Sequence, residues 1–170
     1  FAGRDVAEVL DMTVDDALAF FQANMDKHNA CKRVVDKLLP LQSTGLGYVK
    51  LGQSSSTLSG GEAQRIKLSS FLTKGQEQKP TLFIFDEPTT GLHFHDIAKL
   101  LKAFNDLIEN GHSVLVIEHN LEVIACADHL IDLGLEGGDG GGQLLFEGTP
   151  EQLVAEQRSH TAQFLKAHLG

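Results

Sequence analysis

The sequence predicts an α/β domain built around a parallel sheet. Two continuous apolar runs, at residues 81–85 and 113–117, have the composition of strands that are buried on both faces of such a sheet. Between them, apolar residues recur with helical spacing, and the repeat stops before Gly111, a residue type that favours the end of a helix. A strand, a helix and a second strand in this order predict a βαβ unit, in which the two strands run parallel.

Two helices are expected to come before these strands. The apolar repeat that follows Thr13 predicts a helix over residues 13–21. A second repeat over residues 31–38 predicts another helix, which Pro40 is expected to end, because proline disrupts the turn in which it lies.

The other elements follow from capping residues, glycine runs and short apolar patterns, and no linker is long enough to divide the chain. In order, they are a helix from residue 59 to about 72, a polar loop at 74–80, a short helix at 121–127, weaker strands at 129–133 and 143–147 on either side of a glycine-rich turn at 137–142, and terminal helices at 150–157 and 162–169.

The composition argues against several classes of protein. The 170 residues carry 14 Lys and Arg against 23 Asp and Glu, and a net charge of −9 argues against an extended basic groove for DNA or an anionic membrane. No apolar run approaches the roughly 20 residues that cross a bilayer, and no secretory signal is recognisable. Two cysteines without a CxxC pair argue against a disulfide framework or a zinc cluster, so a cytoplasmic setting is expected.

Ser59-Gly60-Gly61-Glu62 is the first candidate site. Helix capping alone explains a serine followed three residues later by a glutamate. It does not explain the two glycines, which weaken the start of a helix. Glycines leave backbone N–H groups unobstructed at the positive end of the helix dipole, beside a hydroxyl, and this arrangement suits a terminal phosphate. The pattern therefore supports either a structural cap or a phosphate site.

Asp86 and Glu87 form the second candidate site, directly after the first predicted strand. Ligands of parallel α/β sheets bind at the carboxyl ends of the strands. One carboxylate could hold Mg²⁺ through water while the other polarises an attacking water. The alternative is a solvated acidic turn that Pro88 terminates.

His119 follows the second predicted strand. A lone histidine in such a place is more often a surface residue. Its position one βα unit after Asp86 and Glu87 predicts that all three reach one crevice, where a neutral imidazole could hydrogen-bond a phosphoryl oxygen.

Taken together and in this order, these motifs resemble the UvrA family of ABC-type ATPases. The resemblance rests on LSGGEAQR, LFIFDEPTTGLH, VLVIEHN, DLGLEGGDGGG and FEGTP, and it covers essentially the whole chain. It implies the three-layer fold of P-loop NTPases of the ABC type, with residues 1–170 forming the C-terminal portion of the second nucleotide-binding domain. Residues 1–56 would then be a helical lead-in, 57–148 the core, and 149–170 C-terminal helices.

In such ATPases the nucleotide lies between two domains, one with a phosphate loop and the other with a signature helix. The resemblance implies that Ser59, Gly60 and Gly61 contact the γ-phosphate of ATP held by an opposing domain. Gln64 and Arg65 belong to the same motif and would brace the helix.

The remaining motifs would serve this domain's own nucleotide site. Asp86 would orient Mg²⁺ through water, Glu87 would act as general base or water-positioner, and His119 would sense the γ-phosphate. The loop that couples the two sites would consist of Gly91, Leu92 and His93.

The chain has no G-x-x-x-x-G-K-[ST] phosphate loop, so we expect it to be a fragment that holds half of each of two sites. The expected partners are the opposing domain, a second copy of the intact protein, UvrB, and damaged double-stranded DNA gripped mainly by other modules, where zinc is also expected. An ATPase subunit of a membrane transporter is the alternative, although Thr90-Gly91-Leu92-His93 departs from the usual transporter loop. A non-enzymatic docking module is a third interpretation.

Overall fold

The structure, a computed structural model, describes residues 1–26, 28–72, 79–135, 138 and 141–169. The chain groups into two compact units, Phe1–Ile117 and Glu118–Gly170. The polar loop expected at 74–80 and the glycine-rich turn expected at 137–142 fall largely outside the described residues. Within the described ranges, no helix is long and apolar enough to cross a membrane.

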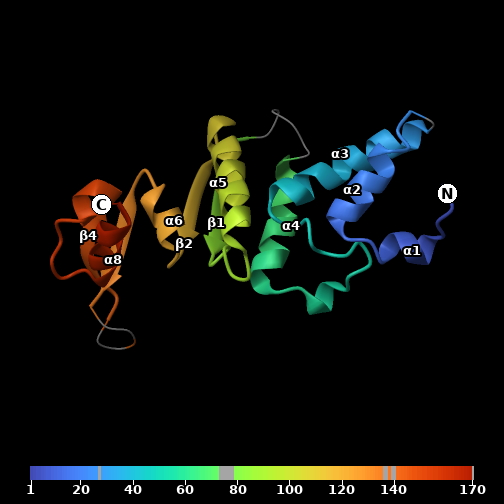
Figure 1. Cartoon of the computed structure of the whole chain (residues 1–170). Helices are drawn as coiled ribbons and strands as arrows, with labels where there is room; N and C mark the ends of the chain where they lie inside the picture. The colour runs from blue at the N-terminus through green and yellow to red at the C-terminus, as the bar shows by residue number, and fades with distance from the viewer. Residues whose placement is uncertain (27, 73–78, 136–137, 139–140, 170) are drawn as a thin grey trace. The chain divides into compact units, whose positions relative to one another are not determined.

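The first unit begins with three helices, α1 (Val6–Leu10), α2 (Val14–Gln22) and α3 (Asn29–Ser43) (Figure 1). The Thr13 side chain accepts a hydrogen bond from the backbone N–H of Asp16 and so caps α2 as expected. Helices α2 and α3 pack through a shared apolar cluster whose buried members are Val14, Ala17, Leu18, Val35 and Leu38. Both helices predicted in this part of the chain are confirmed.

Helix α3 does not end at Pro40, so this detail of the prediction is wrong. The helix continues to Ser43 with Pro40 inside it. The turn after the proline is held by the Pro40 carbonyl, which accepts hydrogen bonds from Ser43 Oγ at 2.9 Å, Thr44 N at 3.2 Å and Thr44 Oγ1 at 3.1 Å. These bonds hold the last turn of the helix in place after the proline.

After the short 3₁₀ helix η1 (Ser55–Thr57), the first unit contains α4 (Gly60–Leu72), β1 (Leu82–Asp86), α5 (Phe94–Glu109) and β2 (Ser113–Ile117). Strands β1 and β2 pair in parallel, which confirms the predicted βαβ unit. One face of the pair packs against α4 and α5 through a core whose buried residues are Leu68, Phe85, Leu100, Ala103, Phe104 and Leu107.

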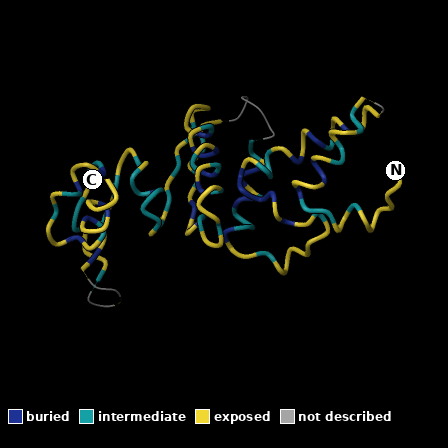
Figure 2. Tube along the Cα trace, in the orientation of Figure 1, coloured by how far each residue is buried: buried dark blue, intermediate teal, exposed yellow. Residues whose placement is uncertain are grey.

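The other face of β1 and β2 is exposed, which contradicts the expectation of strands buried on both faces. Successive side chains of a strand point to opposite faces, so alternate residues of the apolar runs lie away from the helices. Within the described residues of the first unit, α4 and α5 cover one face of the pair. Figure 2 shows exposed stretches along the trace of the two strands. The exposed fractions on the open face are 60% for Leu82, 62% for Ile84, 44% for Leu115 and 50% for Ile117.

The second unit contains α6 (Leu121–Ala125), β3 (Leu130–Gly134), β4 (Gln143–Gly148), α7 (Pro150–Leu153) and α8 (His160–Leu169). Strands β3 and β4 pair antiparallel. Thr149 and Gln152 form a reciprocal capping box at the start of α7, but this helix ends at Leu153, earlier than residue 157. The buried core consists of Leu153, Ala162 and Leu165.

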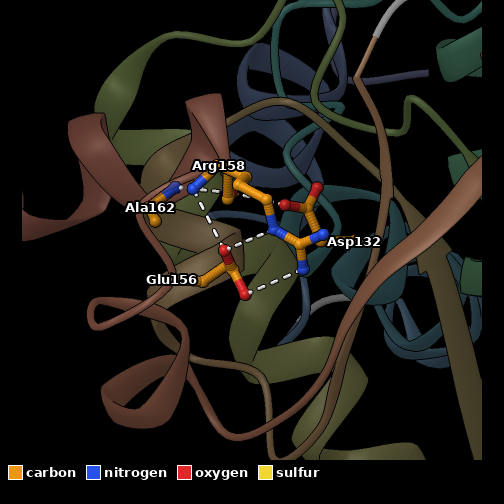
Figure 3. A network of polar contacts seen from close by, with 5 residues as sticks. Asp132, Glu156, Arg158 and Ala162 are labelled. Carbon is orange, nitrogen blue, oxygen red and sulfur yellow. Dashed lines mark hydrogen bonds and ion pairs between the residues drawn. The ribbon is translucent and has the colours of Figure 1, made fainter.

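A polar network joins β3 to α8. Ser159 is fully buried, its hydroxyl donates to Asp132, and its Oγ accepts the Ala162 N–H at 2.9 Å. Thr161 also donates to Asp132, at 3.3 Å. Nearby, Arg158 pairs with Glu156 (Figure 3). A carboxylate beside the positive end of a helix is favourable, so Asp132 holds the start of α8 on the sheet.

Candidate functional site

The N-terminus of α4 is capped in both directions by Ser59 and Glu62. The Ser59 hydroxyl accepts the Glu62 N–H at 3.2 Å, and the Glu62 carboxylate accepts the Ser59 N–H at 2.7 Å. This backbone bond, helped by a 2.7 Å hydrogen bond from the Tyr48 hydroxyl, lowers the pKa of Glu62. Ser59 and Gly60 are exposed, so the positive end of the helix faces solvent.

The two glycines at the start of α4 have different surroundings. A side chain at Gly60 would meet nothing within 4 Å. At Gly61, which is buried, a Cβ atom would lie 3.2 Å from Arg65 Nη1 and 3.4 Å from the Thr90 carbonyl oxygen. Gly60 is thus compatible with the approach of a ligand, whereas Gly61 permits close packing of α4 against the turn that follows β1.

This difference predicts opposite effects of alanine on stability. Gly61→Ala is expected to destabilise the protein by about 1–3 kcal/mol, because the new methyl group overpacks a buried contact. Gly60→Ala is the matched control and is expected to be neutral or slightly stabilising, since alanine is the better helix former. Chemical denaturation of the two variants measures the difference, and equal stabilities would contradict the packing role of Gly61.

Asp86 and Glu87 lie at the carboxyl end of β1, and both are exposed. Asp86 is paired with Ile117 of β2, and the Glu87 N–H donates to the Ile117 carbonyl at 2.9 Å. Glu87 has a φ of +46°, a left-handed conformation that non-glycine residues rarely adopt. Backbone outliers of this kind often occur at functional sites, because the surrounding contacts must hold them.

The turn after β1 leads into the loop of Gly91, Leu92 and His93. Gly91 has a φ of +77°, which glycine adopts without strain. Leu92 is half-buried and packs against the core of the first unit, whereas His93 is exposed and lies at the N-cap of α5. The Leu92 side chain therefore has a packing role that the sequence motif alone does not reveal.

Gln64 and Arg65, which belong to α4, also form hydrogen bonds with the turn that follows β1. Gln64 exchanges two hydrogen bonds with the backbone of Asp86, and Arg65 donates to the carbonyls of Pro88 and Thr90. The sequence motif predicted only that these two residues brace the helix. One signal was available, because Arg65 lies four residues after Gly61 and three before Leu68, on the buried stripe of the helix.

His119 belongs to the second unit, where it is exposed and its N–H donates to Glu118 Oε2 at 2.9 Å. The convergence of His119 with Asp86 and Glu87 in one crevice stays a prediction. The other predicted residues lie in the first unit, and their contacts join the signature motif to the acidic end of β1 through Gln64, Arg65 and Gly61.

Across the described residues, no three His, Cys, Asp or Glu side chains gather into a metal-binding group. A magnesium ion does not need one, since it commonly binds through one or two carboxylates together with water and substrate phosphates. The exposed carboxylate of Asp86 at a strand end fits that requirement.

Comparisons with known proteins give relatives over the whole chain, although no protein-family model matches it. UvrABC system protein A from Rhizobium meliloti (strain 1021) is 56% identical over 166 residues, which cover 98% of this chain and 16% of that protein. The crystal structure of UvrA2 from Deinococcus radiodurans superposes with a TM-score of 0.82 and 38% identity, over 100% of this chain and 20% of that one. The chain belongs to the UvrA family. It spans about one sixth of the length of the curated UvrA relative.

The UvrA fold is also related to that of other ABC proteins. A bacterial Atm1-family ABC exporter, solved with ATP bound, matches with a TM-score of 0.52 and 20% identity, over 95% of this chain and 27% of the exporter chain. At this identity the likeness concerns the fold alone. It agrees with the α/β architecture and parallel strands of an ABC-type domain.

Proposed function

We propose that this chain is the part of a UvrA-family ATPase of bacterial nucleotide excision repair that contributes to two nucleotide sites. It supplies a signature helix to one site and an acidic strand end to the other. The main support is the N-terminus of α4, which is capped, exposed to solvent and has open space at Gly60. The same chain also has two exposed carboxylates, Asp86 and Glu87, at the carboxyl end of β1.

At the first site, Ser59, Gly60 and Gly61 contact the γ-phosphate of ATP that an opposing nucleotide-binding domain holds. Backbone N–H groups at a helix N-terminus carry partial positive charge and bind phosphate without a charged side chain. The hydroxyl of Ser59 already accepts the Glu62 N–H, so its own proton is available for a phosphate oxygen.

At the second site, Asp86 would hold Mg²⁺ through water, and the bound ion would supply positive charge to the phosphates. Glu87 orients the attacking water and accepts its proton, and His119 donates a hydrogen bond to the γ-phosphate. The loop at Gly91, Leu92 and His93 would couple the two sites. In support, it follows the turn that contains Glu87 and leads into α5.

The intact protein is proposed to act as a homodimer in the cytoplasm, to sense distorted double-stranded DNA and to load UvrB onto it. The net charge of −9 on this chain supports a division of labour in which other modules grip the DNA. Zinc, where present, is assigned to those modules. A transporter ATPase is the second candidate, and it is supported only by fold likeness at 20% identity.

The proposed function is tested by ATPase assays on the intact protein that carries this segment. We expect hydrolysis that depends on Mg²⁺ and changes when duplex DNA containing a bulky lesion is added, with the undamaged duplex of the same sequence as control. Hydrolysis that responds to neither duplex, but requires a membrane partner, would support the transporter alternative instead.

A further inference from the structure

We propose that Gln64 and Arg65 are positioning residues for Glu87. They hold the turn after β1 against α4, the helix proposed to serve the other nucleotide site, and so connect the two sites through one rigid contact between α4 and this turn. This inference rests on the proposed function, since it assigns a purpose to the contact between α4 and the segment that carries the general base.

Gln64 fixes the near side of the turn. Its Nε2 donates to the Asp86 carbonyl at 3.0 Å, and its Oε1 accepts the Asp86 N–H at 3.2 Å. One side-chain amide therefore satisfies both backbone groups of Asp86, as a neighbouring strand would. Gln64 thus extends the pairing of β1 on the side opposite β2, at the residue that immediately precedes Glu87.

Arg65 fixes the far side of the turn. Its Nη1 lies 2.6 Å from the Pro88 carbonyl oxygen and 3.5 Å from that of Thr90, and its Nη2 donates to the Tyr48 hydroxyl at 3.3 Å. The first of these bonds is short and charge-assisted, and is the stronger of the two carbonyl contacts. The carbonyls on the far side of Glu87 are thereby tied to α4.

The burial of Arg65 is costly, which points to a specific purpose. Its side chain is fully buried, and its Nε has no hydrogen-bond partner in the structure. The nearby Glu62 carboxylate is bridged to the guanidinium through the Tyr48 hydroxyl. An apolar side chain could fill the same stripe of the helix without burying a charge, so packing alone does not account for arginine here.

The two contacts flank the strained residue. Glu87 adopts a φ of +46°, and backbone in this region costs free energy that surrounding contacts must offset. Bonds at residues 86, 88 and 90 set the path of the chain on both sides of Glu87. The same turn touches Gly61, whose absent Cβ would lie 3.4 Å from the Thr90 carbonyl oxygen and 3.6 Å from that of Glu87. The helix start that is proposed to face one γ-phosphate therefore packs close to the backbone of Glu87, the proposed base of the other site.

The test uses the intact protein and three variants, Gln64→Leu, Arg65→Lys and Arg65→Met. Lysine keeps the charge, but its compact ammonium lacks the planar fork with which the guanidinium reaches both the turn carbonyls and the Tyr48 hydroxyl. Lys67→Gln, exposed on the same helix, is the matched control. The measurements are kcat and KM for ATP, the Kd of a fluorescent ATP analogue, the melting temperature, and amide hydrogen exchange of the peptide covering residues 82–93 without nucleotide.

We expect kcat to fall about 10- to 100-fold in Gln64→Leu and Arg65→Met, the range for a misplaced catalytic group, with nucleotide Kd within about twofold of the parent. Arg65→Lys is expected to recover part of kcat. Exchange across residues 82–93 is expected to quicken in the same order, and Lys67→Gln is expected to behave as the parent. If Arg65→Met does not fold, Gln64→Leu and Arg65→Lys carry the test.

The proposal is overturned if folded variants keep the parental kcat, or if exchange of residues 82–93 is unchanged. It is also overturned if kcat falls only in proportion to the folded fraction, because that result describes a structural role. Absence of ATP hydrolysis in the parent protein would contradict the proposed function instead, and the exchange measurement alone would then decide whether Gln64 and Arg65 hold the turn.

Discussion

Replacing Glu87 by glutamine is expected to lower the kcat of the intact protein for ATP about 100- to 10,000-fold, the usual contribution of a general base. Glutamine has nearly the same size, and the hydrogen bond from the residue 87 N–H to the Ile117 carbonyl belongs to the backbone, so the turn should keep its position. The amide cannot accept a proton from the attacking water. Nucleotide binding should be retained, because the lost interaction is made mainly in the transition state.

Steady-state hydrolysis and equilibrium nucleotide binding, measured on the same preparation, separate these two effects. Glu109→Gln is the matched control, since Glu109 is exposed at the end of α5 and its replacement removes the same charge. An unchanged kcat in Glu87→Gln would remove this residue from the proposed mechanism.

The 170-residue chain by itself is expected to bind Mg-ATP with a Kd weaker than about 1 mM, which corresponds to less than about 4 kcal/mol of binding free energy. Its sequence lacks the G-x-x-x-x-G-K-[ST] loop, whose backbone donors and lysine surround the β- and γ-phosphates. The exposed carboxylates of Asp86 and Glu87 repel a polyphosphate unless Mg²⁺ bridges them.

Isothermal titration calorimetry of the chain, with the intact protein titrated in parallel, checks this expectation. Circular dichroism of the same sample confirms that its helices are formed, so that weak binding is not confused with unfolding. Micromolar binding by these residues alone would show that the chain holds a complete nucleotide site, contrary to the proposed division between two domains.

Local sequence patterns predicted much of the fold. The parallel pairing of β1 with β2 followed from two apolar runs separated by a helical repeat, and the caps at Thr13 and Thr149 followed from side chains that accept backbone N–H groups. The end of α5 followed from Gly111, and the structure gives this glycine a φ of +82°, which suits the residue after a helix. Each of these features depends on interactions between residues that are close in the sequence, so a local sequence pattern predicts it.

Features that depend on distant contacts were missed or mistaken. Helix α3 continues past Pro40, and the side chains of Ser43 and Thr44 bond the Pro40 carbonyl in the turn that follows. The division into two units falls directly after Ile117 without a linker, so no change of composition marks it. The contacts of Arg65 with Pro88 and Thr90 join residues more than twenty positions apart. The one sequence signal for these contacts was the position of Arg65, a charged residue, on the buried stripe of α4.

The open apolar face of β1 and β2 has a practical consequence for recombinant work. The exposed apolar side chains on this face belong to Leu82, Ile84, Leu115 and Ile117. Copies of the chain produced in isolation are expected to self-associate through this face as their concentration rises. A monodisperse preparation of residues 1–170 therefore calls for threonine at several of these positions, since it preserves strand propensity while lowering hydrophobicity.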